Sequence, residues 1–204
     1  MKWLKISMRR REWLLFGVLY FVAGYYGCAW LTATRASVAL HIFSWEAGLP
    51  VIPAGIYGYL LPYPAIVLTY LLIRSEVCFR YFVQNIFLVL TIHFLIFLLF
   101  PTAMNRSPVP PGHSWSLTLL RHYYTLDPPQ NLFPSIHVSL PFLSTLSLWP
   151  ERRWWRYVML LATLVICVSV ILIKQHYVVD VIGAIGITAV VYTTRRMALS
   201  PPVN

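Results

Sequence analysis

The chain has 204 residues, of which 59% are hydrophobic and only 11% are charged, and its formal net charge is +10. This composition excludes an ordinary soluble domain and indicates an integral membrane protein. The basic residues stand in short clusters between long apolar runs, which is typical of topology signals beside lipid headgroups, so nucleic acid is not expected as a partner.

A basic start, MKWLKISMRRREW, precedes the first apolar run, which extends from Trp13 to about Ala33. This arrangement resembles a signal peptide, and the following LTATRAS offers small residues for a cleavage site. The run is longer than the hydrophobic region of a signal peptide and matches a complete span. We therefore expect a retained first helix.

Six apolar segments are predicted to cross the membrane, each near the roughly 20 helical residues that a span needs. They are residues 13–33, 49–73, 81–100, 135–149, 154–173 and 177–193. The segments are apolar on all sides, whereas barrel strands would alternate. The expected fold class is all-α, with residues 1–204 as a single bundle of six transmembrane helices. The stretches GIYG and GAIG are predicted to be close-packing points between helices.

Most Lys and Arg residues would lie on one side of these six spans. They are Lys2, Lys5, Arg9, Arg10, Arg11, Arg74, Arg80, Arg152, Arg153, Arg156, Arg195 and Arg196. The positive-inside rule then places both termini in the cytoplasm, and we expect a plasma (inner) membrane protein. Arg35, Arg106, Arg121 and Lys174 fall on the outer side and need another explanation.

The longest connection, residues 101–134, is also predicted on the outer side and contains seven prolines. Its segment 113–125 mixes aromatic and leucine residues with polar ones. Two interpretations stay open, namely a helix lying in the membrane interface or an irregular loop anchored by aromatic side chains.

Polar residues that can perform chemistry meet on this predicted outer side. His176 and Asp180 are four positions apart, which on a helix places them on one face, where a carboxylate can orient an imidazole and stabilise its charged form. Ser135 and His137 stand at the start of an apolar helix, whose free N–H groups suit an anion. Arg106 and Lys174 are predicted on the same side. The Arg106 guanidinium has several N–H donors for phosphate oxygens, and the Lys174 ammonium is a compact positive charge. This combination predicts phosphoryl transfer.

The order and spacing of these residues resemble those of the type 2 phosphatidic acid phosphatase superfamily. FPSIH is similar to its Pro-Ser-x-His motif, and SVILIKQHYVVD is similar to its Ser-Arg-x5-His-x3-Asp motif at Ser169, His176 and Asp180. The resemblance covers residues 101–185 and includes the six-span layout.

The resemblance implies a role for each matching residue. His176 would attack phosphorus and become phosphohistidine, Asp180 would orient it, and His137 would protonate the leaving oxygen. Ser135 and Arg106 would hold the phosphate oxygens. No metal or other cofactor is implied.

Two positions depart from the superfamily motifs. Val170 stands in place of the motif arginine, and Leu99 stands in place of the lysine of Lys-x6-Arg-Pro, of which Arg106-Ser107-Pro108 remains. KQHYVVDV and FPS-x-H are closer to the branch that includes inositol phosphorylceramide and sphingomyelin synthases, which transfer a headgroup to a lipid alcohol. Hydrolysis of a lipid phosphate and headgroup transfer from a phospholipid to a ceramide or diacylglycerol acceptor therefore both stay open.

Three interpretations other than phosphoryl transfer apply to the polar residues. His176 and Asp180 would form an ion pair that only packs helices together, or they would bind a metal ion together with His137. In the third, the chain would be a transporter or assembly partner without enzymatic activity. His93 is expected to hydrogen-bond a neighbouring helix. Arg121 and Asp127 are expected in a salt bridge or turn, with contact to the substrate as the alternative. The sequence leaves the lipid and the oligomeric state open.

Overall fold

A computed structural model describes residues 9–40 and 43–199, and these ranges contain nine α-helices. They are α1 (Arg10–Thr32), α2 (Trp45–Gly48), α3 (Gly55–Tyr59), α4 (Pro62–Leu72), α5 (Glu76–Leu99), α6 (Trp115–Leu126), α7 (Ile136–Leu148), α8 (Trp155–Leu172) and α9 (Val178–Leu199). Within the same ranges the only β pairing consists of two isolated bridges between loops. The prediction of an all-α fold is confirmed.

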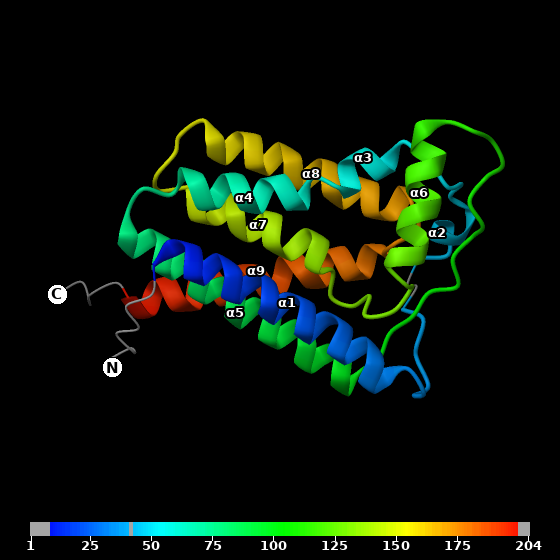
Figure 1. Ribbon diagram of the computed structural model, residues 1–204, viewed down its shortest axis with the longest axis horizontal. Coiled ribbons are helices and arrows are strands. Elements are labelled where there is room, and N and C mark those ends of the chain that lie inside the picture. Colours follow the sequence, from blue (N-terminus) through cyan, green and yellow to red (C-terminus); the bar gives the residue numbers. More distant parts are fainter. Residues whose placement is uncertain (1–8, 41–42, 200–204) are drawn as a thin grey trace.

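Five helical stretches are long and apolar enough to cross a membrane, and they match five of the six predicted segments. They are Arg10–Thr32, Gly55–Leu72, Glu76–Leu99, Trp155–Leu172 and Val178–Met197. The remaining predicted segment, 135–149, forms α7, whose 13 residues span about 20 Å. Because α7 packs against α4, α5, α8 and α9 in the middle of the bundle (Figure 1), it is shielded by protein and needs no full-length lipid-facing surface.

The second spanning stretch is divided into α3 and α4. The division falls at Leu60 and Leu61, directly before Pro62, which begins α4. Proline has no N–H to donate back to the preceding turn but suits the first turn of a new helix. The interruption turns α3 onto α8 near the end of the bundle that contains α6.

Glycine allows α3 and α8 to approach closely. A Cβ on Gly58 would lie 2.0 Å from Ser169 Oγ and 2.9 Å from Ser169 Cβ, and one on Gly183 would lie 2.4 Å from the Phe133 ring. A Cβ on Gly186 would meet nothing within 4 Å. The predicted close packing between helices is thus confirmed for GIYG and is wrong for Gly186, while Gly183 packs closely against Phe133 in the connection before α7.

Gly58→Ala is expected to destabilise the protein, because the new methyl group would force α3 away from α8. Overpacking of this kind costs about 1–3 kcal/mol. Thermal unfolding in detergent should show a clear fall in Tm. The matched control is Gly186→Ala, for which the space is open and the gain in helix propensity leaves Tm unchanged or higher. Equal falls for both variants would contradict this packing.

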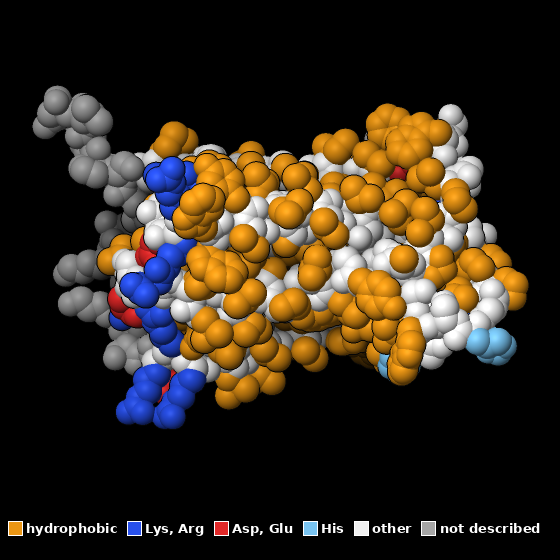
Figure 2. Space-filling view, turned by 90° about the horizontal axis from the view of Figure 1, so that it is seen from above, with side chains coloured by type: hydrophobic (Ala, Val, Ile, Leu, Met, Phe, Trp, Pro, Cys, Tyr) orange, Lys and Arg blue, Asp and Glu red, His pale blue; other side chains and the backbone are white. Residues whose placement is uncertain are grey.

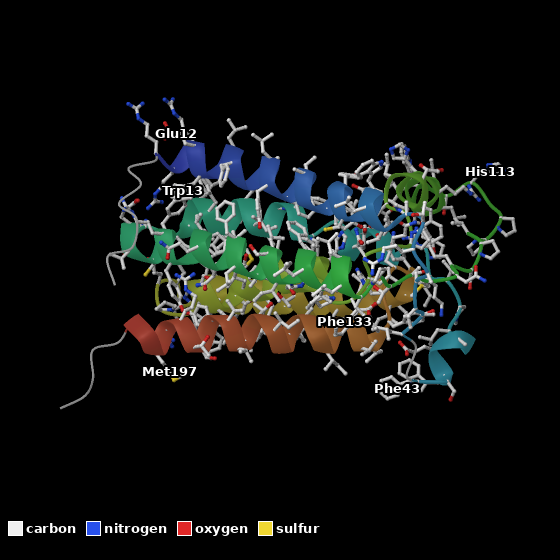
Figure 3. The ribbon with its side chains drawn as sticks, turned by 90° about the horizontal axis from the view of Figure 1, so that it is seen from below. Glu12, Trp13, Phe43, His113, Phe133 and Met197 are labelled. Carbon is white, nitrogen blue, oxygen red and sulfur yellow. The ribbon has the colours of Figure 1, made fainter. Side chains whose placement is uncertain are left out.

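The two ends of the bundle differ in charge. Lys and Arg side chains gather at one end in Figure 2, here called the basic end, whereas hydrophobic side chains cover the sides. Arg10 of α1 donates there to the Ile73 and Arg74 carbonyls, and Arg152 donates to the Leu72 carbonyl. Glu12 and Met197 mark the basic end in Figure 3, and His113 and Phe43 mark the opposite one. Lys2 and Lys5 lie outside the described residues.

Helix α6 lies across the end opposite the basic end, here called the α6 end (Figure 1). Ser114 caps it by accepting a hydrogen bond from the Leu117 N–H. Leu117 and Leu120 are buried against the bundle, whereas Trp115 is 78% exposed. Of the two interpretations of this segment, the helix is confirmed. It covers the ends of α3 and α8 (Figure 1).

Candidate active site

His176 and Asp180 meet at the junction of α8 and α9. His176 Nδ1 lies 3.3 Å from Asp180 Oδ2, with both side chains buried. His176 precedes the first residue of α9 by two positions, so the pair does not share a helix face as expected. The contact forms instead because Asp180 Oδ2 also accepts the Tyr177 N–H at 2.9 Å, which draws the carboxylate back over the helix start.

This contact fixes the orientation of the imidazole. An ionised carboxylate only accepts hydrogen bonds, so Nδ1 of His176 is the nitrogen that donates, and Nε2 is left with its lone pair. The backbone N–H groups of Gln175 and His176 both donate to the Val170 carbonyl, at 2.9 and 3.1 Å. The loop that presents the histidine is therefore anchored on the last turn of α8.

His137 lies in the first turn of α7, beside His176. The centroids of the two rings are 5.9 Å apart, and on its other side His137 stacks on Tyr59 of α3, with 4.4 Å between centroids. Ser135 precedes α7, and its N–H donates to the Asp180 carbonyl at 3.2 Å. The structure thus brings together four of the predicted site residues from α7 and the α8–α9 junction.

Arg106 reaches the same junction from the long connection. Its Nη2 donates to Gln175 Oε1, and its guanidinium lies over the Tyr124 ring, 4.7 Å from the centroid. The pKa of Arg106 is lowered, because the effect of burial exceeds the opposite effect of the nearby Asp127 carboxylate. Its Nε, Nε2 of Gln175 and Oγ of Ser135 are buried and have no hydrogen-bond partner. Each unmet donor of this kind costs about 1–3 kcal/mol.

Lys174 lies near the site but points to a different partner. Its backbone has φ +52°, and its Nζ donates to the Glu46 carbonyl of α2 at 2.5 Å. The pKa of Lys174 is lowered, because the effect of burial exceeds the opposite effect of the Glu46 carboxylate. Glu46 Oε1 in turn accepts the Val178 N–H at the start of α9, at 2.7 Å. The ammonium thus fastens α2 to the α8–α9 junction.

The two positions that depart from the superfamily motifs have different environments. Val170 is completely buried among apolar side chains that include Ile56 and Ile166, and Leu99 is 78% exposed at the end of α5. Both side chains are hydrocarbon, so neither can donate a hydrogen bond or supply a positive charge to a phosphate.

Asp127 and Gln175 also lie in this region, although neither was predicted as a site residue. Asp127 Oδ1 accepts the Tyr25 hydroxyl at 2.6 Å, and Oδ2 accepts the Tyr59 hydroxyl, so this carboxylate joins α1 and α3 to the end of α6. It lies in a turn, as expected, but without a salt bridge in the described residues. Gln175 carries no charge, and only its place next to His176 could have drawn attention to it.

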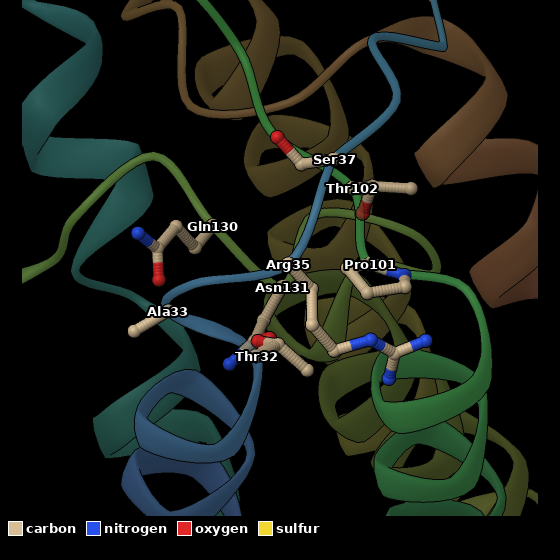
Figure 4. Close-up of a pocket in the computed structure, with 8 residues that line it drawn as sticks. All are labelled: Thr32, Ala33, Arg35, Ser37, Pro101, Thr102, Gln130 and Asn131. Carbon is tan, nitrogen blue, oxygen red and sulfur yellow. The ribbon is translucent and has the colours of Figure 1, made fainter.

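Three further basic or histidine residues, Arg121, His93 and Arg35, have structural partners. Arg121 donates to the Gly112 and Pro110 carbonyls, and His93 hydrogen-bonds Ser139 of α7 at 2.9 Å, which confirms the expected contact with a neighbouring helix. Arg35 borders a cavity of about 50 Å³, but its guanidinium points toward the end of α5, where it donates to the Leu98 carbonyl (Figure 4). A cation at this helix end is favourable.

Within the described residues, no group of three His, Cys, Asp or Glu side chains is arranged to hold a metal ion.

A family model described as the PAP2 superfamily matches residues 29–194, a range that includes every residue of the site. No curated protein and no solved structure matches the chain.

Proposed function

The chain belongs to the PAP2 superfamily, whose members are generally phosphatases or phosphotransferases, and we propose that it acts on a lipid phosphate with His176 as the nucleophile. The observation that supports this most directly is the buried contact between His176 Nδ1 and Asp180 Oδ2, which leaves Nε2 of His176 available. Positioned by a carboxylate, an imidazole is an effective nucleophile.

The proposed reaction has two steps. In the first, Nε2 of His176 forms a bond to phosphorus while the bond from phosphorus to the leaving oxygen breaks, and His137 gives that oxygen its proton. In the second, an acceptor hydroxyl loses its proton to His137 and attacks the phosphohistidine, which frees His176. The 5.9 Å between the two ring centroids allows both imidazoles to contact one phosphoryl group.

Ser135, Arg106 and Lys174 are proposed to stabilise the phosphate. Ser135 Oγ and Arg106 Nε have no partner in the protein and are therefore available as donors. Lys174 is proposed to contribute positive charge from a greater distance, since its ammonium donates to Glu46. Charge-assisted hydrogen bonds to phosphate are among the strongest available to a side chain.

The acceptor distinguishes the two proposed activities. Water would make the protein a lipid phosphatase, whereas the hydroxyl of ceramide or diacylglycerol would make it a headgroup transferase. Purified protein should be incubated with lipid phosphates and with phospholipids, in the presence and absence of each acceptor lipid. Free phosphate would identify the phosphatase, and a new phospholipid would identify the transferase. If no combination yields free phosphate or a new phospholipid, the proposal is contradicted.

The site is proposed to face away from the cytoplasm, at the plasma (inner) membrane, with both termini cytoplasmic. The support is that the basic end and the α6 end lie on opposite sides of the spanning helices (Figure 2), and basic residues are retained on the cytoplasmic side. The lipid would then enter from the outer leaflet.

This orientation predicts a labelling pattern in intact cells. A cysteine in place of the exposed Ser107 should react with an impermeant thiol reagent, whereas Cys78, in the first turn of α5 at the basic end, should not. Permeabilising the cells should make Cys78 reactive, which controls for its accessibility. Labelling of Cys78 in intact cells would reverse the orientation and the proposed side of the site.

A further inference from the structure

The amide of Gln175 is oriented by Arg106. A guanidinium has only donors, so the amide oxygen must face it, and Oε1 indeed accepts from Arg106 Nη2. The other end of the amide, Nε2, is left buried without a partner, and the side chain is only 2% exposed. Arg106 Nε is in the same condition. Two N–H donors of one hydrogen-bonded pair are thus unmet.

The pair is joined to the reacting histidine through the backbone. Gln175 directly precedes His176, and the backbone N–H groups of both residues donate to the Val170 carbonyl, so one anchor holds the loop that carries the amide and the nucleophile. Ser135, whose hydroxyl is also unmet, is joined to Asp180 by its backbone N–H. The unmet groups therefore belong to one continuous network around His176.

We infer that Gln175 binds the substrate's phosphate, donating through Nε2 to a non-bridging oxygen while its Oε1 holds Arg106. This inference rests on the proposed function, and it assigns to the Arg106–Gln175 pair the clamp that Val170 cannot provide. Phosphate oxygens only accept hydrogen bonds, so a ligand of this class would satisfy Nε2 of Gln175, Nε of Arg106 and the Ser135 hydroxyl together.

The competing explanation is that Gln175 acts only by holding Arg106. A double-mutant cycle separates the two explanations. If Gln175 acts only through Arg106, its replacement should have no further effect in a protein that lacks Arg106. Gln175→Leu should therefore be compared with wild type and, separately, in an Arg106→Ala background. The readouts are kcat/KM for a soluble aryl phosphate and the inhibition constant of orthovanadate.

Gln175→Leu is expected to lower kcat/KM and to weaken vanadate inhibition by about 10- to 100-fold, and to cause a further loss of about tenfold in the Arg106→Ala background. No further loss there would overturn the inference. Gln175→Glu is the second variant, since it keeps an oxygen for Arg106 but removes the N–H donor; vanadate inhibition as strong as in wild type would also overturn the inference.

Gln84 provides a matched control at the basic end, where its Oε1 accepts from Arg195 Nη2 at 2.6 Å. Gln84→Leu removes a similar amide and arginine pair and should leave kcat/KM and vanadate inhibition unchanged. Stabilisation of the wild-type protein by vanadate in thermal unfolding should be measured as well. Stabilisation by vanadate without turnover of any phosphate ester would count against the proposed function. If kcat/KM and vanadate inhibition are the same in Gln175→Leu as in wild type, the result would count against this inference alone.

Discussion

Replacement of His176 by alanine is expected to abolish turnover on every substrate, with a loss of about 10⁴-fold or more. In the proposed mechanism the imidazole forms the bond to phosphorus, and a water molecule in its place would be neither activated nor oriented by Asp180. Because His176 is buried and its Nδ1 contacts the Asp180 carboxylate, no other side chain can take its position. Activity should be measured on a lipid phosphate and on an aryl phosphate.

Two controls make this result interpretable. The variant must elute from a sizing column in detergent as the wild type does, because Asp180 would lose its partner in the protein interior. His122→Ala removes an exposed imidazole from α6 and should leave turnover unchanged. Near-normal activity of a folded His176→Ala protein would show that the nucleophile has been assigned to the wrong residue, even though the family is established.

His137→Ala is expected to have an effect that depends on the leaving group. A lipid alkoxide needs a proton as it departs, so loss of the general acid should slow turnover by about 10²–10⁴-fold. A nitrophenolate leaves without one, and release of the phenol should be slowed by about tenfold or less. The position of His137 between the His176 ring and Tyr59 is consistent with this role.

The first, single-turnover release of the alcohol and of the nitrophenolate should be measured on the same preparation, because the second step is common to both substrates. Tyr59→Phe is the control, since it keeps the stacked ring and loses the hydroxyl that donates to Asp127. Equal slowing of the first release on the lipid phosphate and the aryl phosphate in His137→Ala would mean that His137 does not donate the proton, and that its ring serves binding or packing instead.

The spanning segments could be predicted because lipid imposes one simple demand on their composition. The short segment 135–149 agrees with α7, Ile136–Leu148, within one residue at each end, although composition alone does not tell a helix surrounded by other helices from one facing lipid. Predicted residues 81–100 also missed the first turn of α5, which starts at Glu76 because Ser75 caps it by accepting the Cys78 N–H.

Most of the residues that meet around His176 were predicted to do so from the sequence, whereas Asp127, Glu46 and Gln175 were not. His176 and Asp180 were recognised by spacing, whereas Gln175 gives no signal in a count of charges. The direction of Lys174 depends on a left-handed backbone turn and on Glu46, which lies 128 positions away in the chain. Asp127 is likewise defined by tyrosines from α1 and α3, and such long-range partners become visible only in the folded structure.

In the proposed mechanism, His176 carries the phosphoryl group between donor and acceptor. This covalent intermediate can be trapped by mixing the protein with a ³²P-labelled phosphate ester, quenching in alkali within milliseconds, and mapping the labelled peptide. We expect an acid-labile, alkali-stable label on the peptide that contains His176, and none in His176→Ala. A label on another residue, or turnover by a wild-type protein that never becomes labelled, would contradict the account.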